Sequence, residues 1–306
     1  MDNTELTRYR RALKRKNYSA HTLKSYMNIL DHFLRWAPVP LCEVHSKEIG
    51  LYVDHLLQKR RTPKTITCHL QTIRLFFDYL LQEEGIPMAN PVTRISIRLP
   101  KPLPRHLKDD QVSRLLAVIT DLRDKAMFML MLRCGLRVQE VADLTVDAVD
   151  CQRKQIFVSK GKGGKDRIVY VSEDARSALL AYLSKRSAKG KSLFLVQKGT
   201  MWGQPLSVRG IQKRMEYYAR KSKLNVSCHR LRHTMATQLL NADAALVTIQ
   251  DLLGHGQITT TQRYCWVANL KVQRDYYKAM EVVLQRTQAR GGDAEEGKIV
   301  GPPETQ

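Results

Sequence analysis

Long hydrophobic runs are missing from this sequence of 306 residues. No apolar stretch approaches the roughly 20 residues that a membrane-spanning helix requires, which excludes a multi-span membrane protein. The polar stretch from Met1 to Arg11 has no apolar segment of the kind found in secretory signals. We therefore expect a cytoplasmic protein with no membrane partner. A hydrophobic fraction of 43% still provides enough apolar material for one or two cores.

Cysteines are few, and no two of them form a CxxC pair. A chain of this length without dense cysteine spacing is not expected to depend on a disulfide framework. The pattern is typical of reduced intracellular thiols. The six cysteines are Cys42, Cys68, Cys134, Cys151, Cys228 and Cys265.

Acidic residues are scarce relative to basic ones. There are 29 Asp and Glu against 51 Lys and Arg, which gives a formal net charge of +22 and an isoelectric point near 9.9. The net charge is +9 over residues 1–105, +14 over 106–284 and −1 over 285–306, so no single basic tail accounts for it. A basic surface spread in this way is typical of nucleic-acid-binding proteins, although general solubility is an alternative explanation.

The first hundred residues predict a small helical bundle. Ser19 and Thr22 can cap a helix over 20–36, where apolar residues recur at helical spacing. A second helix is expected over 49–57, and a third begins near Pro63. The exposed faces of these helices carry many Lys and Arg side chains.

Prolines mark the end of this bundle. Pro100, Pro102 and Pro104 stand at alternate positions, which favours an extended connector. The expected organisation is an N-terminal domain, a Pro-rich linker, a second domain and a disordered tail. Their boundaries are 1–97, 98–105, 106–288 and 289–306.

The second domain is expected to contain mostly helices and a small antiparallel sheet, so the chain as a whole is mainly α. Two β-like runs, 155–159 and 167–171, flank a glycine-rich hairpin tip at 160–166. A further short strand is possible at 193–195. Helices are expected over 111–120, 123–134, 173–184, 211–221, 228–241 and 245–253.

Arg137 and Glu140 follow an expected helix end at Gly135. Arg137 lies among apolar neighbours, and a buried arginine needs an anionic partner. Two interpretations are open. Arg137 can form an internal ion pair with Glu140, or it can face a phosphate while Glu140 holds it in place.

His229 and Arg232 share a helix face because they are three residues apart. Ser227 can cap this helix and place His229 in its first turn, where anions are favoured. An imidazole and a guanidinium there suit a phosphate, although an ordinary basic helix face is the alternative.

The same segment has the histidine spacing of some zinc sites. His229 and His233 stand four residues apart, as in HExxH metalloproteases. The intervening residues contain no glutamate and include Arg230 and Arg232, whose charges would repel a divalent cation. We therefore expect no metal site.

Basic residues gather on the glycine-rich tip at Lys160, Lys162 and Lys165, with Arg167 just after it. The segment lacks the GxxxxGK[ST] order of a phosphate-binding P-loop. The tip can be a solvated turn that touches phosphates non-specifically. Alternatively, it can deliver a mobile lysine to an active site as a proton donor.

Tyr264 follows a polar, β-branched stretch near the C-terminus. Free tyrosine has a pKa near 10, so it becomes a nucleophile only where cations stabilise the phenolate or the transition state. The alternative is a half-buried tyrosine that packs on Trp266.

These groups together fit one reaction, the attack of a tyrosine on a phosphodiester. Two arginines and a histidine can neutralise the charge on the phosphate, and a lysine can protonate the departing oxygen. The motifs resemble those of the tyrosine recombinases of the lambda-integrase, Cre and Xer type, over roughly residues 10–285. They are Gly135-Leu-Arg-Val-Gln-Glu140, Gly161-Lys-Gly163, His229-Arg-Leu-Arg-His233, Leu253-Gly-His255, and Tyr264 nine residues after His255.

The resemblance implies a role for each matching residue. Tyr264 would be the nucleophile that forms a 3′-phosphotyrosyl link to DNA. Arg137 and Arg232 would clamp the scissile phosphate, with Glu140 supporting Arg137. His255 would add a hydrogen bond to the phosphate.

Further roles and a domain plan follow from the same resemblance. His229 would act as a general base or positioning group, and Lys162 would be the general acid, with Lys165 as the alternative. No metal, ATP or other cofactor is required. The implied fold is a helical, SAM-like core-binding domain followed by a mixed α/β catalytic domain of the DNA breaking-rejoining type. Candidate DNA contacts are Lys24, Arg74, Lys101, Lys160, Lys165, Arg167 and Arg230.

The resemblance also implies partners. Members of the family act as tetramers on two double-stranded DNA sites and exchange strands through a Holliday junction. The helix expected over 269–285 would dock on a neighbouring subunit, and accessory DNA-bending or related recombinase proteins are possible partners. Integration, transposition and resolution are all open as biological tasks. The competing functions are a type IB topoisomerase-like nicking-closing enzyme and a non-catalytic DNA-binding regulator.

Overall fold

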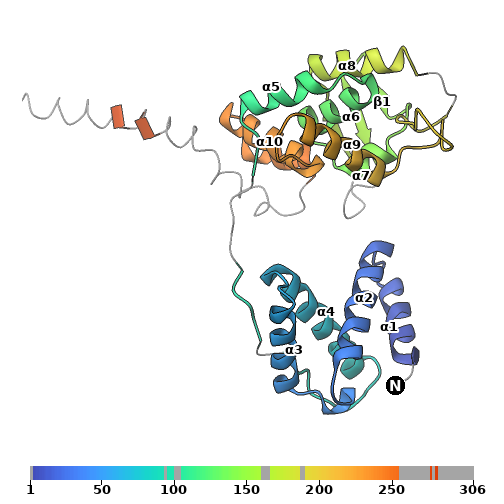
Figure 1. Cartoon of the computed structure of the whole chain (residues 1–306), viewed down its shortest axis with the longest axis vertical. Coiled ribbons are helices and arrows are strands. Elements are labelled where there is room, and N and C mark those ends of the chain that lie inside the picture. The colour runs from blue at the N-terminus through green and yellow to red at the C-terminus, as the bar shows by residue number, and fades with distance from the viewer. Residues whose placement is uncertain are drawn as a thin grey trace, which may run out of the picture. The chain divides into compact units, whose positions relative to one another are not determined.

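The protein is represented by a computed structural model. It describes residues 3–92, 95–99, 105–159, 166–186, 190–254, 276–277 and 280–281. The chain divides into two compact units, Met1–Lys101 and Pro102–Gln306 (Figure 1). The division falls inside the Pro-rich segment 98–105 that was expected to be a linker. Among the described residues, no helix is both long and apolar enough to cross a membrane.

The N-terminal unit is a helical bundle. Ser19 caps its second helix by accepting a hydrogen bond from the backbone N–H of Thr22. The third helix begins three residues earlier than expected, because the Glu48 carboxylate accepts a hydrogen bond from the backbone N–H of His45 at 2.9 Å and closes the first turn. The helices are α1 (Asn3–Arg15), α2 (Ala20–Trp36), α3 (Ser46–Gln58) and α4 (Pro63–Gln82), with a 3₁₀ turn η1 (Leu41–Glu43).

The C-terminal unit contains more helices than strands, as expected. Helix α6 is buried along most of its length and packs against α8 and α10. Helix α5 begins at Asp109, two residues earlier than expected, with Lys108 in the capping position. The described helices are α5 (Asp109–Val118), α6 (Leu122–Arg133), α7 (Val138–Asp143), α8 (Glu173–Leu183), α9 (Val208–Lys221), α10 (Cys228–Asn241) and α11 (Leu246–Leu253).

The small sheet is antiparallel, with strand order β1-β2-β3. Val158 of β2 is paired with Arg167 of β3, and residues 160–165 of the hairpin tip between them lie outside the described residues. The strand that was possible at 193–195 is not a strand in the structure; Leu195 forms only an isolated bridge to Pro205. The strands are β1 (Val149–Asp150), β2 (Gln155–Val158) and β3 (Arg167–Tyr170).

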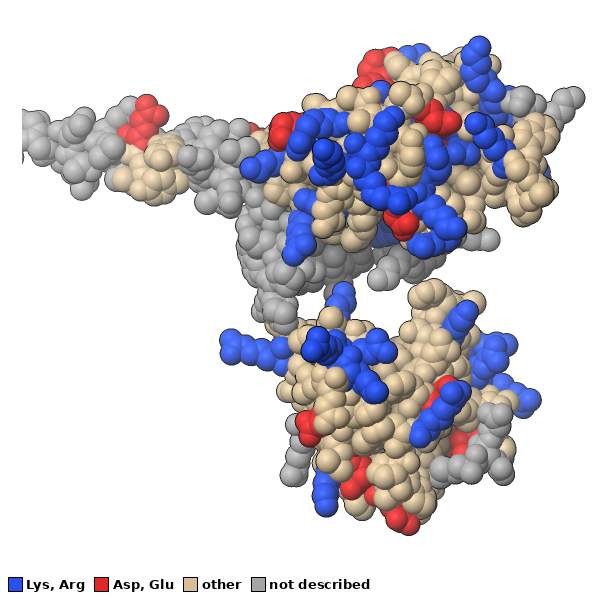
Figure 2. Space-filling model, in the orientation of Figure 1, with Lys and Arg blue, Asp and Glu red and all other residues tan. Residues whose placement is uncertain are grey.

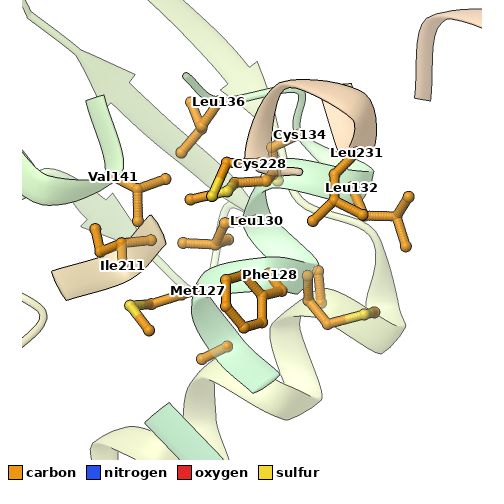
Figure 3. Close-up of a cluster of buried hydrophobic side chains, with 14 of the residues drawn as sticks. Met127, Phe128, Leu130, Leu132, Cys134, Leu136, Val141, Ile211, Cys228 and Leu231 are labelled. Carbon is orange, nitrogen blue, oxygen red and sulfur yellow. The ribbon is translucent and has the colours of Figure 1, made fainter. Parts of the chain in front are cut away.

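The core of the C-terminal unit surrounds α6 (Figure 3). Met127, Phe128 and Leu130 project from this helix into a cluster that includes Ile211 of α9 and Leu231 of α10. Each of these side chains is at most 1% exposed. The cluster fixes the positions of α7 and α10 relative to α6, and the described candidate catalytic side chains lie on α10 and at the start of α7.

Candidate active site

Helix α10 begins where its capping residue predicts, with His229 in its first turn. The Ser227 hydroxyl accepts a hydrogen bond from the backbone N–H of Arg230 at 3.3 Å, which starts the helix at Cys228. Arg232 lies on the inward side and is only 2% exposed, whereas His229 is exposed. The rings of His229 and His233 meet edge to face, with their centroids 4.2 Å apart.

Arg137 and Glu140 form the internal ion pair that is one of the two interpretations open from the sequence. Arg137 stands immediately before α7, and its backbone N–H donates to Glu140 Oε2 at 2.8 Å. Its guanidinium Nη1 donates to Oε1 of the same carboxylate at 2.7 Å. The Arg137 side chain stays 23% exposed, so it is paired and still accessible from solvent. The internal ion pair and the phosphate-facing arginine, which the sequence left as alternatives, are therefore compatible.

Arg167 occupies a different position from the one expected of a DNA contact. Its side chain is 9% exposed and forms a bidentate ion pair with Glu140. Nη1 donates to Oε1 and Nη2 donates to Oε2, both at 2.8 Å. Its Nε donates to the backbone carbonyl of Leu252 at 2.9 Å. Local sequence did not reveal this pairing, because Glu140 lies on another element of the fold.

Three guanidinium groups converge on the C-terminal end of α11. The last carbonyl groups of a helix have no partner within the helix, and the helix dipole favours cations there. Arg232 also donates to the carbonyl of Gly135. The three bonds to α11 are Arg167 Nε to Leu252 O at 2.9 Å, Arg232 Nη2 to Leu253 O, and Arg137 Nη2 to Gly254 O at 3.2 Å.

The arginine cluster (Arg137, Arg167 and Arg232) is strongly positive. Glu140 is the carboxylate bonded to two of its members, so the three arginines and this one acid carry a formal charge of +2. Charges of one sign that are partly shielded from water attract a counter-ion more strongly than exposed charges do. The cluster can therefore stabilise an anion, and a phosphodiester is a suitable one.

Two glycines allow the cluster to close. Gly135 has φ +66°, and a Cβ there would lie 3.1 Å from Leu253 Cδ2 and from Met235 Sδ. Gly254 ends α11 with φ +58°, and a Cβ there would lie 3.1 Å from Arg167 Cδ. Both positions need the left-handed backbone that glycine adopts readily, and both bring the backbone close to a side chain.

Gly254→Ala is expected to lower the free energy of unfolding by about 2 kcal/mol. The left-handed backbone costs a non-glycine residue about 1 kcal/mol, and the contact with Arg167 adds to that cost. Gly203→Ala is a matched control, because Gly203 has φ +76° but open space around it, and it should lose only about 1 kcal/mol. Urea unfolding measures the free energy of unfolding of both variants. An equal decrease in the two variants would mean that Arg167 is not packed against Gly254.

The pKa of Glu140 reflects its surroundings. Burial by itself would raise it, but hydrogen bonds from the Arg167 side chain and from the Arg137 backbone, together with the nearby positive charge, lower the pKa to about 2. Glu140 therefore stays ionised over the whole physiological pH range, and its charge holds both arginines in place.

Glu140→Gln is expected to weaken the pH dependence of stability. The folded-state pKa lies below the ordinary value of 4.5, so the stabilisation is complete above pH 4.5 and is lost as the pH falls toward 2. Between pH 7 and pH 3 the wild type should lose on the order of 2 kcal/mol more than the variant. Urea unfolding at a series of pH values measures this difference; parallel curves for the two proteins would contradict the assignment.

The other expected DNA contacts within the described residues fall into two groups. Lys24 is exposed on α2. Arg74 and Arg230 instead bond to backbone carbonyls: Arg74 Nη2 donates to Val92 O at 2.8 Å, and Arg230 Nη2 donates to His106 O at 3.0 Å. These two guanidinium groups tie distant segments of their own units together, a use that their local sequence did not indicate.

Several predicted site residues lie outside the described part of the chain. They include the expected nucleophile and general acid. These residues are Lys101, Lys160, Lys162, Lys165, His255 and Tyr264. Among the residues that are described, no three His, Cys, Asp or Glu side chains are grouped closely enough to hold a metal ion.

Comparison with known proteins identifies the family. Residues 105–270 match the phage integrase family, and residues 6–86 match the phage integrase N-terminal SAM-like domain. The chain belongs to the phage integrase family. The family that the motifs predicted is therefore confirmed.

Curated relatives of this integrase family member are tyrosine recombinases. XerA of Thermococcus kodakarensis is 31% identical over 271 residues, which cover 87% of this chain and 92% of XerA. XerC of Thermodesulfovibrio yellowstonii is 33% identical over 287 residues, which cover 87% of this chain and 93% of XerC. These relationships identify the chain as a tyrosine recombinase and hence as an enzyme of DNA recombination.

Solved structures share its fold. The Tn1549 transposon integrase, solved in complex with transposon right end DNA, aligns with a TM-score of 0.73 at 21% identity, covering 85% of this chain and 93% of that one. A lambda integrase, solved as a tetramer bound to a Holliday junction, aligns with a TM-score of 0.70 at 19% identity, covering 85% and 76%. The expected fold class, mostly helical with a small antiparallel sheet, is therefore confirmed.

Proposed function

We propose that this recombinase cuts and rejoins double-stranded DNA at specific sites through a 3′-phosphotyrosyl intermediate on Tyr264. The observation that carries the proposal is the convergence of Arg137 and Arg232 on the carbonyls of Gly254 and Leu253, immediately before His255 in the chain. Arg232 of α10 and Arg137, which immediately precedes α7, thereby meet at the end of α11, from which the chain continues toward the tyrosine. Their fixed charge suits the phosphate oxygens that become more negative during cleavage.

The proposed reaction conserves the energy of the phosphodiester bond. The Tyr264 hydroxyl attacks phosphorus and loses its proton to His229 or to water that His229 positions. The bond to the 5′-oxygen breaks, and this oxygen takes a proton from Lys162, with Lys165 as the alternative donor. The new phosphotyrosyl bond is then attacked by a 5′-hydroxyl of the partner strand, which releases the tyrosine. No ATP is needed, because one ester bond is exchanged for another at each step.

The surface charge supports binding along a DNA backbone. Figure 2 shows Lys and Arg side chains spread over the viewed face of the C-terminal unit, with few Asp and Glu among them. The whole chain carries a formal net charge of +22. We propose that the N-terminal domain 1–97 binds the DNA near the cleavage site, with Lys24 as a contact. The linker 98–105 connects it to the catalytic domain 106–288, which binds the same DNA. Such binding is expected in the cytoplasm.

Assembly into a tetramer is part of the proposal. The segment 269–285 has apolar residues at helical spacing, which suits docking on a neighbouring subunit. A pocket of about 900 Å³ opens between α5, α6 and α10, with apolar side chains from Leu132, Met235 and Leu239 in its lining. Its size and apolar lining are compatible with holding part of such a helix. Accessory DNA-bending proteins or related recombinases are compatible with the same assembly.

The experiment that tests this function begins by finding the DNA site. Random-sequence duplexes carrying a nick would be incubated with the protein, and the DNA that stays linked to protein after denaturation would be sequenced. Plasmids with one or two copies of the recovered site would then be assayed for supercoil relaxation and for recombination. We expect recombination of the two-site plasmid, undiminished by EDTA.

The alternative functions predict other results in the same assay. A topoisomerase-like enzyme would relax a single-site plasmid without recombining the two-site one. A non-catalytic regulator would yield no protein-linked DNA at all. Either outcome would overturn the proposed function.

A further inference from the structure

We propose that Arg167 is a positioning residue that aligns Arg137 for catalysis and does not contact DNA. This inference rests on the proposed function, because it assigns Arg167 a part in the same reaction. Arg167 links the start of β3, the Arg137–Glu140 pair and the end of α11.

The guanidinium of Arg167 is already engaged at all three of its nitrogen atoms. Nη1 and Nη2 donate to the two oxygens of Glu140, and Nε donates to Leu252 O. Its side chain is only 9% exposed. A DNA phosphate would have to displace a buried, two-pronged carboxylate pair to reach it, and breaking such a pair is costly.

Glu140 depends on Arg167 for its orientation. Each of its oxygens accepts one hydrogen bond from Arg167 and one from Arg137: Oε1 from the two Nη1 groups, Oε2 from Arg167 Nη2 and the Arg137 backbone N–H. An ionised carboxylate has about four acceptor positions, so these four bonds leave none free. Without Arg167, two positions would be empty, and Glu140 could rotate toward other donors and take the Arg137 guanidinium with it.

Arg167 also fixes the last turn of α11. It bonds the carbonyl of Leu252, one residue before the carbonyl held by Arg232 and two before the carbonyl held by Arg137. The absence of a side chain at Gly254 lets the Arg167 chain pass close to the helix end. The residue that follows Gly254 is His255, so the position of Arg167 sets the starting point of the segment that leads to Tyr264.

Arg167→Lys and Arg167→Met are the variants that separate positioning from DNA contact. Lysine keeps the charge but cannot form the bidentate pair with Glu140, and methionine has neither the charge nor the pair. Both variants should therefore slow single-turnover cleavage at saturating DNA by on the order of 10- to 100-fold. Both should keep the wild-type dissociation constant and the wild-type slope of log affinity against log salt. Arg153→Met is the control for loss of charge, because Arg153 is 81% exposed and lies outside the cluster; it should cleave DNA at the wild-type rate.

A DNA contact predicts the opposite pattern. Arg167→Lys would then retain most of the activity, and Arg167→Met would reduce the salt slope by about 0.9, the value for one lost phosphate contact. That result would overturn the inference. A variant that is only poorly folded would lose active protein in proportion, lowering the amplitude of cleavage and not its rate constant.

A double-mutant cycle tests the route through Glu140. If Arg167 acts by holding Glu140, adding Arg167→Lys to Glu140→Gln should slow cleavage by less than threefold beyond Glu140→Gln alone. Fully multiplicative effects of the two substitutions would contradict this route.

Chemical labelling of the wild type shows whether Arg167 contacts DNA, even if the variants fold poorly. Phenylglyoxal modifies accessible arginines, and mass spectrometry identifies the modified positions. Arg167 should remain unmodified with and without DNA, while Arg153 reacts in the free protein. Modification of Arg167 in the free protein and its protection by DNA would overturn the inference. If the wild type formed no covalent protein–DNA adduct, the proposed function would be contradicted instead. The labelling would still show whether Arg167 is buried in the protein or accessible to DNA.

Discussion

Tyr264→Phe is expected to bind DNA with wild-type affinity and to form no covalent protein–DNA adduct. The substitution removes only the hydroxyl oxygen that would attack phosphorus, and it leaves the arginine cluster and the charge of the chain unchanged. The proposed mechanism has no other nucleophile, so the expected loss of adduct is complete. Denaturing gel electrophoresis of end-labelled nicked substrate measures the adduct, and a mobility shift on the same substrate measures binding.

Tyr276 and Tyr277 supply matched controls for this variant. Both side chains are about 60% exposed and lie in the same C-terminal part of the sequence. Tyr276→Phe and Tyr277→Phe should each form the adduct, because neither stands at the spacing from His255 that identifies Tyr264. Adduct formation by Tyr264→Phe would show that another group is the nucleophile and would remove the basis of the mechanism.

Arg232→Ala is expected to slow cleavage by about 10²- to 10⁴-fold. A preorganised donor that meets charge in the transition state typically contributes a factor of 10² to 10³, and Arg232 also connects Gly135 to the end of α11. Its loss would remove both the charge and the bridge. Single-turnover cleavage at saturating DNA measures the rate, because binding then no longer limits it.

Arg232→Lys distinguishes the two contributions. Lysine restores the charge but not the planar fork that bonds two carbonyls at once. Its cleavage rate should therefore lie between those of the wild type and Arg232→Ala. Because Arg232 is only 2% exposed, circular dichroism and urea unfolding should accompany the rates. A wild-type cleavage rate in a folded Arg232→Ala protein would exclude Arg232 from the phosphate site.

Much of the fold follows from local patterns in the sequence. Helix α10 runs over 228–241 as expected, because Ser227 caps it and apolar residues recur along one side. The β2–β3 hairpin also has nearly its expected bounds. The catalytic family was recognisable because its residue types stand at fixed spacings. These features depend on neighbours within a few residues, and such patterns can be read from one sequence.

The interior of the active site depends on distant contacts that no local pattern reveals. In the sequence, Arg167 is one of several basic residues at or next to a hairpin tip, but its partner Glu140 lies 27 residues away on another element. Arg230 and the arginine cluster donate to backbone carbonyls. Because every residue has a backbone carbonyl, the sequence does not show which of them accepts a hydrogen bond. Whether an arginine faces DNA or the protein interior therefore depends on tertiary packing.

The most direct test of the account is to identify the amino acid and the DNA end that are joined. Protein trapped on the nicked substrate would be digested with trypsin and nuclease and examined by mass spectrometry. We expect a nucleotide linked through its 3′-phosphate to the peptide 264–271, in which Tyr264 is the only tyrosine. A link through a 5′-phosphate, or to any other residue, would contradict it.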